Sequence, residues 1–302
     1  MTSNSNGILK TTNLKTTRPK NKYHVKFNLD NNTATSDTSH KQGKFINPSK
    51  IKILSLNINS LKNAKQELVS AILTEGNIDI LVACETKLDS SILTSELNLP
   101  PSYSIYRKDR TADGGGVLIA IKNTIAHEKH DELNTDCEIV WISITLQSKK
   151  NLHIASYYRP PNATEESIIN LRNSLQKLRT KSKQNPIIII GDFNIPHVDW
   201  DTLTTIPTPG ASTKNSNLLL ELVNDYGLDQ TVRGPTRGKN TLDLCMTTHL
   251  GLIEKTSTTP GVSDHDGVEI ILNTKPMLTK KNTKTDIHLL QSRHASFATG
   301  LT

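Results

Sequence analysis

The chain has 302 residues, of which 34% are hydrophobic, below the ordinary globular average of about 45–50%, so we expect part of it to stay outside any packed core. No apolar run is long enough for a transmembrane helix, and the first residues form no apolar signal segment. Three scattered cysteines, Cys84, Cys137 and Cys245, exclude a disulfide framework and a cysteine zinc site. These features predict a reducing, intracellular setting and no membrane partner.

The formal charge of +7 is distributed unevenly along the chain. Most of the excess lies in the first 50 residues and in residues 275–302, whereas the middle is mildly acidic. The ends are also polar and show no periodic apolar face. We therefore expect a disordered basic arm rich in Asn, Thr and Ser over residues 1–50, one folded domain over 51–273, and a basic tail or linker over 274–302.

Eight apolar, β-rich runs predict strands in the middle region. They cover Ile51–Leu56, Ile78–Cys84, Val117–Ile121, Ile139–Leu146, Leu152–Tyr157, Ile187–Ile190, Leu242–Met246 and Val268–Leu272. Three helices are predicted between them: from Leu61 to near Gly76, from an N-cap at Thr164 to about Lys181, and through Leu218–Tyr226 to Gly227. Some strands are separated by helices and others by short turns, which favours mixed sheets with flanking helices over a doubly wound parallel sheet.

Polar side chains follow three of these strands. Asp192 and Asn194 stand two residues apart after the strand 187–190, so both side chains point to one face. Glu85 follows the strand that ends at Cys84, and Asn57 follows the first strand. Each position alone is also typical of a turn, a cap or a solvated loop.

Two further positions carry acidic or imidazole groups. Asp243 lies between leucines in an apolar strand, where a carboxylate is costly unless a partner such as a histidine pairs with it. Ser263-Asp264-His265 cannot form a serine-protease triad, because members of such a triad must face one another; an Asx-type loop is the alternative. Together the five segments supply Asp, Glu and Asn oxygens without cysteine, a ligand set suited to Mg²⁺.

Seven segments in order and spacing resemble the endonuclease domain of LINE-type (non-LTR) retrotransposons, especially Jockey-like elements. They are LNINSL (56–61), CET (84–86), YRKDRTADGGGV (106–117), YYRPPN (157–162), GDFN (191–194), PTRGKNTLDL (235–244) and SDH (263–265). That domain belongs to the endonuclease/exonuclease/phosphatase superfamily, with exonuclease III, apurinic endonuclease and DNase I. The resemblance, which spans about 51–273, implies an α/β (α+β) four-layer sandwich in which two mixed β-sheets pack face to face between helices.

The resemblance also implies roles for individual residues. Glu85, Asn57 and Asp264 are expected to hold Mg²⁺, for which Mn²⁺ would be a substitute. The residues expected to be catalytic are Asp192 (orienting or deprotonating the attacking water), Asn194 (hydrogen bonding at the same site), Asn57 (beside Glu85), His265 (phosphate binding), Asp243 (fixing the His265 tautomer and charge) and Tyr158 (donating to a phosphate oxygen).

Two basic segments are expected to contact DNA. Residues 233–240 are predicted to form a hairpin with Gly238 and Asn240 at turn positions; in relatives a hairpin here lies in the minor groove, although a solvated turn is the alternative. A second loop precedes Gly114–Gly116 and could also be a plain antiparallel turn. The expected DNA-binding residues are Arg233, Thr236, Arg237, Lys239, Arg107, Arg110 and Ser263, the last of which either contacts phosphate or shapes its loop.

The resemblance implies a Mg²⁺-dependent DNA endonuclease that nicks one strand and leaves a 3′-hydroxyl to prime reverse transcription at the target. Its expected partners are double-stranded DNA and the reverse transcriptase domain of a full element protein, which residues after Leu272 do not resemble; its expected site of action is nuclear. One alternative is a phosphomonoesterase of the same fold acting on inositol phosphates, disfavoured by the Leu-Asp-Leu setting of Asp243. Another is an inactive remnant that only binds nucleic acid.

Overall fold

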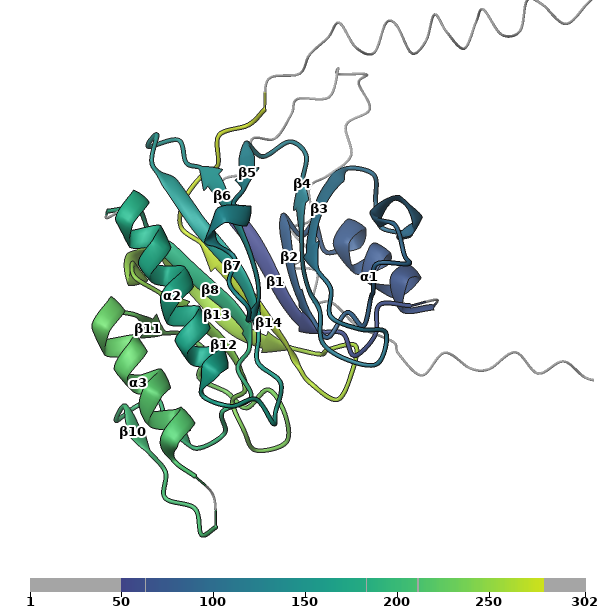
Figure 1. Cartoon of the computed structure of the whole chain (residues 1–302). Helices are drawn as coiled ribbons and strands as arrows, with labels where there is room; N and C mark the ends of the chain where they lie inside the picture. Colours follow the sequence, from purple (N-terminus) through teal and green to yellow (C-terminus); the bar gives the residue numbers. More distant parts are fainter. Residues whose placement is uncertain (1–49, 63, 183, 211, 280–302) are drawn as a thin grey trace, which may run out of the picture. The chain divides into compact units, whose positions relative to one another are not determined.

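The structure, a computed structural model, describes residues 50–62, 64–182, 184–210 and 212–279 (Figure 1). The predicted basic arm, apart from Lys50, and residues 280–302 of the predicted tail lie outside the described residues. Among the described helices, none is long and apolar enough to cross a membrane.

Two six-stranded mixed sheets form the centre of the domain. The first has the order β13 (Ile253–Thr259), β14 (Gly267–Leu272), β1 (Ile51–Asn57), β2 (Ile80–Cys84), β4 (Val117–Lys122) and β3 (Tyr103–Lys108). The second has the order β11 (Asp229–Gln230), β12 (Asp243–Thr247), β8 (Ile187–Asp192), β7 (Asn151–Tyr158), β6 (Glu138–Thr145) and β5 (His127–Lys129). A short ribbon of β9 (Val198–Asp199) and β10 (Thr204–Thr205) stands apart from both sheets.

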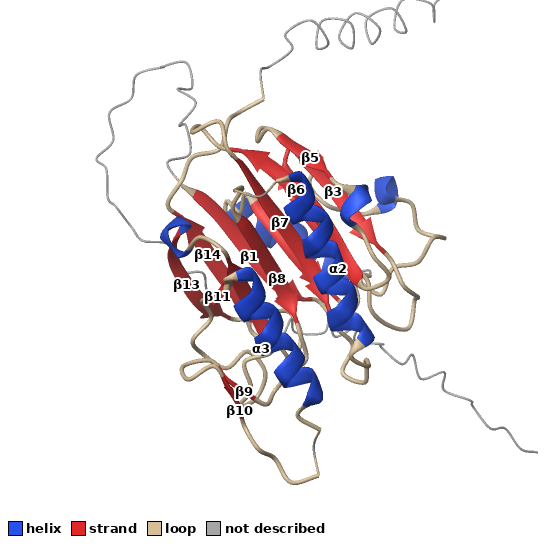
Figure 2. Cartoon of the chain, turned by 60° about the vertical axis from the view of Figure 1, so that its left-hand side comes forward, coloured by secondary structure: helices blue, strands red, loops and turns tan. Residues whose placement is uncertain are grey.

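Helices cover the outer faces of the two sheets. In Figure 1, α1 (Ala64–Glu75) lies beside the first sheet, and Figure 2 shows α2 (Glu166–Lys181) and α3 (Lys214–Tyr226) running across the second. Single 3₁₀ turns, η1 (Thr94–Glu96), η2 (Asp131–Leu133) and η3 (Leu250–Leu252), lie in the connections. The predicted four-layer sandwich is therefore confirmed.

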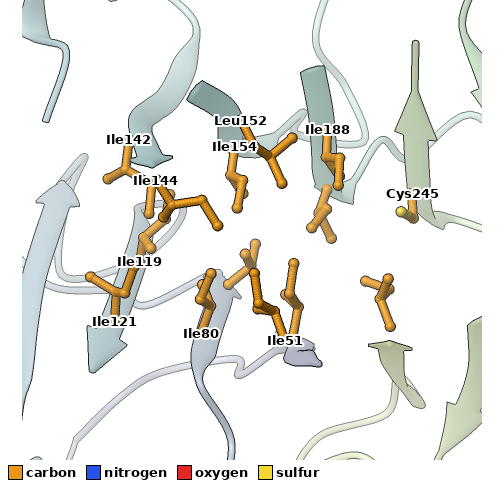
Figure 3. Packing of buried hydrophobic residues seen from close by; sticks show 14 of the residues in the cluster. Ile51, Ile80, Ile119, Ile121, Ile142, Ile144, Leu152, Ile154, Ile188 and Cys245 are labelled. Carbon is orange, nitrogen blue, oxygen red and sulfur yellow. The ribbon is translucent and has the colours of Figure 1, made fainter. Parts of the chain in front are cut away.

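Two apolar clusters hold the layers together. The first lies between the sheets and joins isoleucines such as Ile80, Ile142 and Ile188, each fully buried (Figure 3). The second lies between the second sheet and its helices and includes Leu171, Leu175 and Leu219. Burying an aliphatic side chain of this size stabilises the fold by about 1.5–3 kcal/mol, which explains why such runs dominate the interior strands.

Several element boundaries differ from the sequence predictions. The first helix starts at Ala64, after a buried Leu61 that the predicted stripe had included. The N-cap of α2 is Glu165 instead of Thr164, and its side chain makes no capping hydrogen bond. The third helix ends as predicted, because Gly227 adopts the left-handed conformation that lets its N–H reach the last carbonyls. After β14 the chain stays attached to the domain, since the Met277 N–H donates to the Thr145 carbonyl at 2.7 Å.

Strand direction brings the polar strand ends to one edge of the sandwich. β1 runs parallel to β2, and β7 runs parallel to β8, so each pair ends at the same edge of its sheet. β12 is antiparallel to β8 with Asp243 opposite Asp192, and β14 is antiparallel to β1 with Val268 opposite Ser55. Because β1 and β2 also pack against β7 and β8, the two edges face each other.

Candidate active site

The ends of β1, β2 and β7 place three side chains together. The Asn57 amide donates from Nδ2 to Glu85 Oε1 at 3.0 Å, and the Tyr158 hydroxyl donates to the same oxygen at 3.1 Å. Burial raises the pKa of Tyr158 well above its ordinary value, and the charge of Glu85 adds to the shift, so the phenol stays protonated as a donor.

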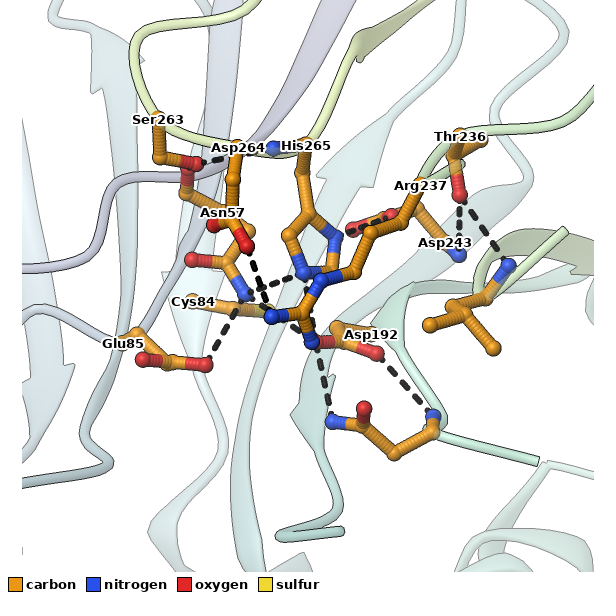
Figure 4. A network of polar contacts seen from close by, with 12 residues as sticks. Asn57, Cys84, Glu85, Asp192, Thr236, Arg237, Asp243, Ser263, Asp264 and His265 are labelled. Carbon is orange, nitrogen blue, oxygen red and sulfur yellow. Dashed lines mark hydrogen bonds and ion pairs between the residues drawn. The ribbon is translucent and has the colours of Figure 1, made fainter. Parts of the chain in front are cut away.

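Asp192 lies at the centre of the arrangement and is fully buried (Figure 4). Its carboxylate accepts hydrogen bonds from Asn57 Nδ2 at 3.0 Å, from Asn194 Nδ2 at 2.9 Å and from the Asn194 backbone N–H at 3.0 Å. Burial raises the pKa of Asp192, and the charge of Asp243 raises it further, against the opposing effect of His265 and these donors. A carboxylate with a raised pKa is suited to take a proton near neutral pH.

His265 links the two aspartates. Its Nδ1 lies 2.7 Å from Asp243 Oδ2, and its Nε2 lies 3.9 Å from Asp192 Oδ2, with all three side chains at most 4% exposed. Burial opposes the charged imidazolium, but the hydrogen bond and charge of Asp243, together with Asp192, raise the pKa of His265 overall. The buried Asp243 therefore has the histidine partner that its apolar surroundings required.

The loop that carries His265 is fixed by Ser263. The Ser263 hydroxyl donates to the Asn57 carbonyl at 2.6 Å, and its Oγ accepts the His265 backbone N–H at 3.2 Å. In the same loop Asp264 turns toward solvent and pairs with Arg237 at 2.6 Å, with side chains 55% and 44% exposed. Although partial burial acts in the opposite direction, Arg237 lowers the pKa of Asp264. The structure thus pairs Asp264 with Arg237, and its predicted role as a metal ligand stays a prediction.

Two groups of side chains could hold a metal ion. Donor atoms of Asp192, Asp243 and His265 lie within 4.8 Å of one another, but these groups are buried and already hydrogen-bonded to one another or to amides. Glu85 differs: its Oε2 lies 3.9 Å from Lys87 Nζ, and the side chain is 19% exposed. A reachable carboxylate oxygen beside a carboxamide fits a hard cation such as Mg²⁺, so Glu85 and Asn57 are the better candidates.

The segment 233–240 forms a tight turn before β12. Arg237 and Asn240 close it by paired backbone hydrogen bonds, with Gly238 at φ 59° and Lys239 between them. Gly238 and Asn240 were predicted at turn positions; Gly238 lies inside the turn and Asn240 closes it. Lys239 is exposed at the tip of the turn.

Thr236 and Arg233 lie at different depths in this segment. Thr236 is buried, and its Oγ1 accepts the backbone N–H groups of Leu242 and Asp243, both at 3.0 Å. Figure 4 shows this hydroxyl beside Asp243. Arg233 is exposed and lies 3.4 Å from Asp201. Thr236 thus fixes the start of the strand that carries Asp243, whereas Arg233 and Lys239 are accessible to a large ligand.

Arg107 and Arg110 take different positions. Arg107 donates to the Ile92 carbonyl and pairs with Asp109 at 3.3 Å, with only 12% of its side chain exposed, so it does not join the site. Arg110 donates from Nη1 to Glu138 Oε1 at 2.9 Å and lies 5.9 Å from the centre of the Tyr158 ring. The structure therefore brings Arg110, but not Arg107, to the edge of the site.

Two buried charged residues beside the site, Arg159 and Glu138, were not predicted from the sequence. Arg159 is 2% exposed and donates to the carbonyls of Asn194 and Ala163, while its own carbonyl accepts Asn194 Nδ2 at 2.8 Å. Glu138 is 9% exposed and accepts hydrogen bonds from Arg110 and the Gly116 N–H. The available signals were the YYRPPN segment and the three glycines, but their buried partners are distant in sequence.

Comparisons with known proteins concern the fold of the chain. Residues 152–269 match the model of a family described as endonuclease-reverse transcriptase. The endonuclease domain of TRAS1, a telomere-specific non-LTR retrotransposon, is 16% identical, with a TM-score of 0.56 over 74% of this chain and 98% of that one. The AP endonuclease LMAP from Leishmania major is 14% identical, with a TM-score of 0.60 over 74% of this chain and 88% of that one.

A further similar structure is the 3′ phosphatase NExo from Neisseria bound to a product DNA hairpin. It is 17% identical, with a TM-score of 0.53 over 73% of this chain and 98% of that one. A search of the curated proteins finds no match. These likenesses confirm the predicted fold and the predicted resemblance to retrotransposon and apurinic endonucleases.

Proposed function

We propose that this protein is a Mg²⁺-dependent DNA endonuclease. The proposal is supported by its fold, which is that of the endonuclease/exonuclease/phosphatase superfamily, and by the match to a family described as endonuclease-reverse transcriptase. The protein nicks one strand of double-stranded DNA and leaves a 3′-hydroxyl that primes reverse transcription by a partner reverse transcriptase domain. Its site of action is nuclear.

One observation carries the proposal: the Asn57 amide joins the candidate metal ligand to the candidate base. Its Nδ2 lies 3.0 Å from both Glu85 Oε1 and Asp192 Oδ2, and 3.5 Å from His265 Nε2. A phosphate placed against these groups meets a donor, a base and an imidazolium at once. Four segments that are distant in the sequence thus bring two carboxylates, a carboxamide and an imidazole into one network.

The role that we propose for each residue follows from its surroundings. A divalent cation held by Glu85 and Asn57 would stabilise the negative charge that develops on the phosphate and on the leaving oxygen. Asp192 accepts the proton of the attacking water, His265 neutralises charge on the phosphate with support from Asp243, and Tyr158 donates to a phosphate oxygen.

DNA is the substrate that the surroundings of the site favour. The exposed cations Arg233 and Lys239 lie on the segment that leads into β12, so they can contact phosphates on either side of the reacting one. Arg237 lies on the same segment and is 44% exposed beside Asp264. A polymer with several phosphates makes use of these cations beyond the reacting group, which favours DNA over a small inositol phosphate.

The test is to incubate the protein with supercoiled plasmid and Mg²⁺ and to sequence the ends of the nicked product. We expect nicks whose 3′ ends a polymerase extends without prior phosphatase treatment, and no nicking by Asp192→Ala. Phosphate release from inositol phosphates without nicking would assign the site to a phosphomonoesterase. DNA binding without nicking, unchanged by Asp192→Ala, would identify an inactive remnant.

A further inference from the structure

The glycine stretch 114–116 has no part in the proposed chemistry, yet its conformation is strongly constrained. Gly115 and Gly116 have φ values of 70° and 89°, which favour glycine. A Cβ at Gly115 would collide with the carboxylate of Glu138, and a Cβ at Gly116 would collide with the hydroxyl of Thr86. The two glycines therefore allow a close approach between the start of β4, the start of β6 and the loop after β2.

An ion pair between the buried Glu138 and the exposed Arg110 lies where these segments meet. Glu138, the first residue of β6, accepts a hydrogen bond from Arg110 Nη1 at 2.9 Å and another from the Gly116 backbone N–H. Arg110 also donates from Nε to the Gly114 carbonyl at 3.0 Å. The pair thus fixes both ends of the glycine stretch and connects the first sheet to the second.

The glycine stretch in turn holds the loop that carries Glu85. The carbonyls of Gly115 and Gly116 accept the backbone N–H groups of Lys87 and Thr86 at 2.9 and 3.2 Å. Glu85 and Lys87 both have a φ of 51°, a conformation that costs about 1–2 kcal/mol for a residue with a Cβ. These two hydrogen bonds help to keep the loop in that conformation.

Glu138 and Arg110 are also connected to the Glu85 carboxylate through Tyr158. Glu138 lies opposite Tyr158 in the β6–β7 ladder, and the Arg110 guanidinium lies 5.9 Å from the Tyr158 ring centre. The Tyr158 hydroxyl donates to Glu85 Oε1 at 3.1 Å. Both the backbone and the hydroxyl partner of Glu85 therefore depend on the ion pair.

We infer that Glu138 and Arg110 are positioning residues that hold Glu85 and Tyr158 in place for cation and phosphate binding, and that Arg110 acts within the protein instead of contacting DNA. This inference rests on the proposed function, because it takes Glu85 as the ligand of the divalent cation.

The experiment measures Mn²⁺ affinity by calorimetry for the wild type, Glu138→Gln, Glu138→Ala, Arg110→Ala and the Glu138→Ala/Arg110→Ala double variant. We expect each alanine variant to bind Mn²⁺ about 10- to 100-fold more weakly, the cost typical of losing a group that orients a metal ligand. The double variant should lose less affinity than the product of the two single losses, since the two changes share the Glu138–Arg110 contact. Glu138→Gln keeps an acceptor for the Gly116 N–H and should recover part of the loss.

Two measurements separate positioning from a structural or DNA-binding role. In plasmid nicking, the alanine variants should have a lower kcat with little change in KM. The salt dependence of DNA binding should be the same for Arg110→Ala as for the wild type. Glu128→Ala, which changes an exposed carboxylate on the adjacent strand β5, is the matched control and should behave like the wild type. Thermal unfolding of every variant, with Glu138→Gln as the mildest, identifies any loss that comes from unfolding.

Unchanged Mn²⁺ affinity in folded Glu138→Gln and Arg110→Ala would overturn the inference. So would weaker DNA binding by Arg110→Ala with a salt slope reduced by about one, the sign of a lost phosphate contact. If the wild type binds Mn²⁺ and the variants bind it more weakly while no protein nicks DNA, the proposed function fails and the positioning role stands. If the wild type binds no Mn²⁺, unchanged hydrogen exchange at the Thr86 and Lys87 amides in Glu138→Gln would refute the role.

Discussion

Replacing Asp243 by Asn tests the electrostatic role of the buried histidine pair. The Asp243 carboxylate lies 2.7 Å from His265 Nδ1, and the two side chains are 4% and 1% exposed. The carboxamide of Asn has nearly the same shape and can still accept the Nδ1–H, so the variant removes charge and leaves the packing in place. The change therefore isolates the contribution of the negative charge.

The expected magnitude follows from this contact. A hydrogen bond to a charged group contributes about 1.5–3 kcal/mol, which corresponds to about 10- to 150-fold in rate at 1.36 kcal/mol per factor of ten. Asp243 also raises the pKa of His265, so the variant should lose the charged imidazolium at a lower pH than the wild type. Plasmid nicking should therefore slow about 10- to 150-fold near pH 7.5, and the alkaline fall in rate should move to lower pH.

The assay is the initial nicking rate between pH 5.5 and 9 at saturating Mg²⁺. Asp229→Asn makes the same chemical change at an exposed position on the neighbouring strand β11 and should leave the profile unchanged. A folded Asp243→Asn protein whose rate and pH profile match those of the wild type would show that the charge of Asp243 has no part in the reaction.

Three predictions concern stability. Burial lowers the pKa of His153 to about 4, so the unfolded chain binds more protons between pH 6.5 and 4, and the free energy of unfolding should fall by about 3 kcal/mol as the pH drops through this window. His153→Leu should remove that fall in urea titrations at pH 7 and pH 4. Gly191→Ala places a Cβ against a carbonyl of β7 at φ 144° and should cost about 3 kcal/mol or more, whereas Gly251→Ala, with open space around it, should cost far less. Ser174→Ala removes the acceptor of the buried Trp141 Nε1–H and should cost about 1–3 kcal/mol at an unchanged urea m-value.

The strands that the sequence predicts are those in the interior of the sheets. All eight predicted runs correspond to strands of the two large sheets, because a strand with neighbours on both sides is buried on both faces and reads as an apolar run. The strands that were missed in these sheets are β3, β5, β11 and β13, which are the four edge strands. An edge strand such as β13, with the sequence IEKTSTT, is partly exposed and polar, so hydrophobic patterning does not distinguish it from a loop.

In the site, too, some features could be predicted from the sequence and others could not. The sequence identifies the residue types that the chemistry needs, since Asp192, Asp243 and His265 stand out at the ends of apolar strands. It does not predict that Asp264 pairs with Arg237, because this contact depends on how two separate loops meet in space. Glu138 escaped notice for the same reason, as a carboxylate at the start of a strand is ordinary until its buried partners are known.

The backbone conformation of the loops around Glu85 could not be predicted from local sequence preferences. Asn59, Ser60, Glu85 and Lys87 all have positive φ values, between 47° and 87°, and only asparagine adopts this region readily. Local preference would therefore extend these loops and separate them. Tertiary hydrogen bonds prevent this: the Ser60 N–H donates to the Glu85 carbonyl at 2.7 Å, and the glycine stretch holds the other side. The strain persists because both neighbours of the loop are fixed by the sheets, which makes the position of the Glu85 carboxylate a property of the whole sandwich and not of its own segment.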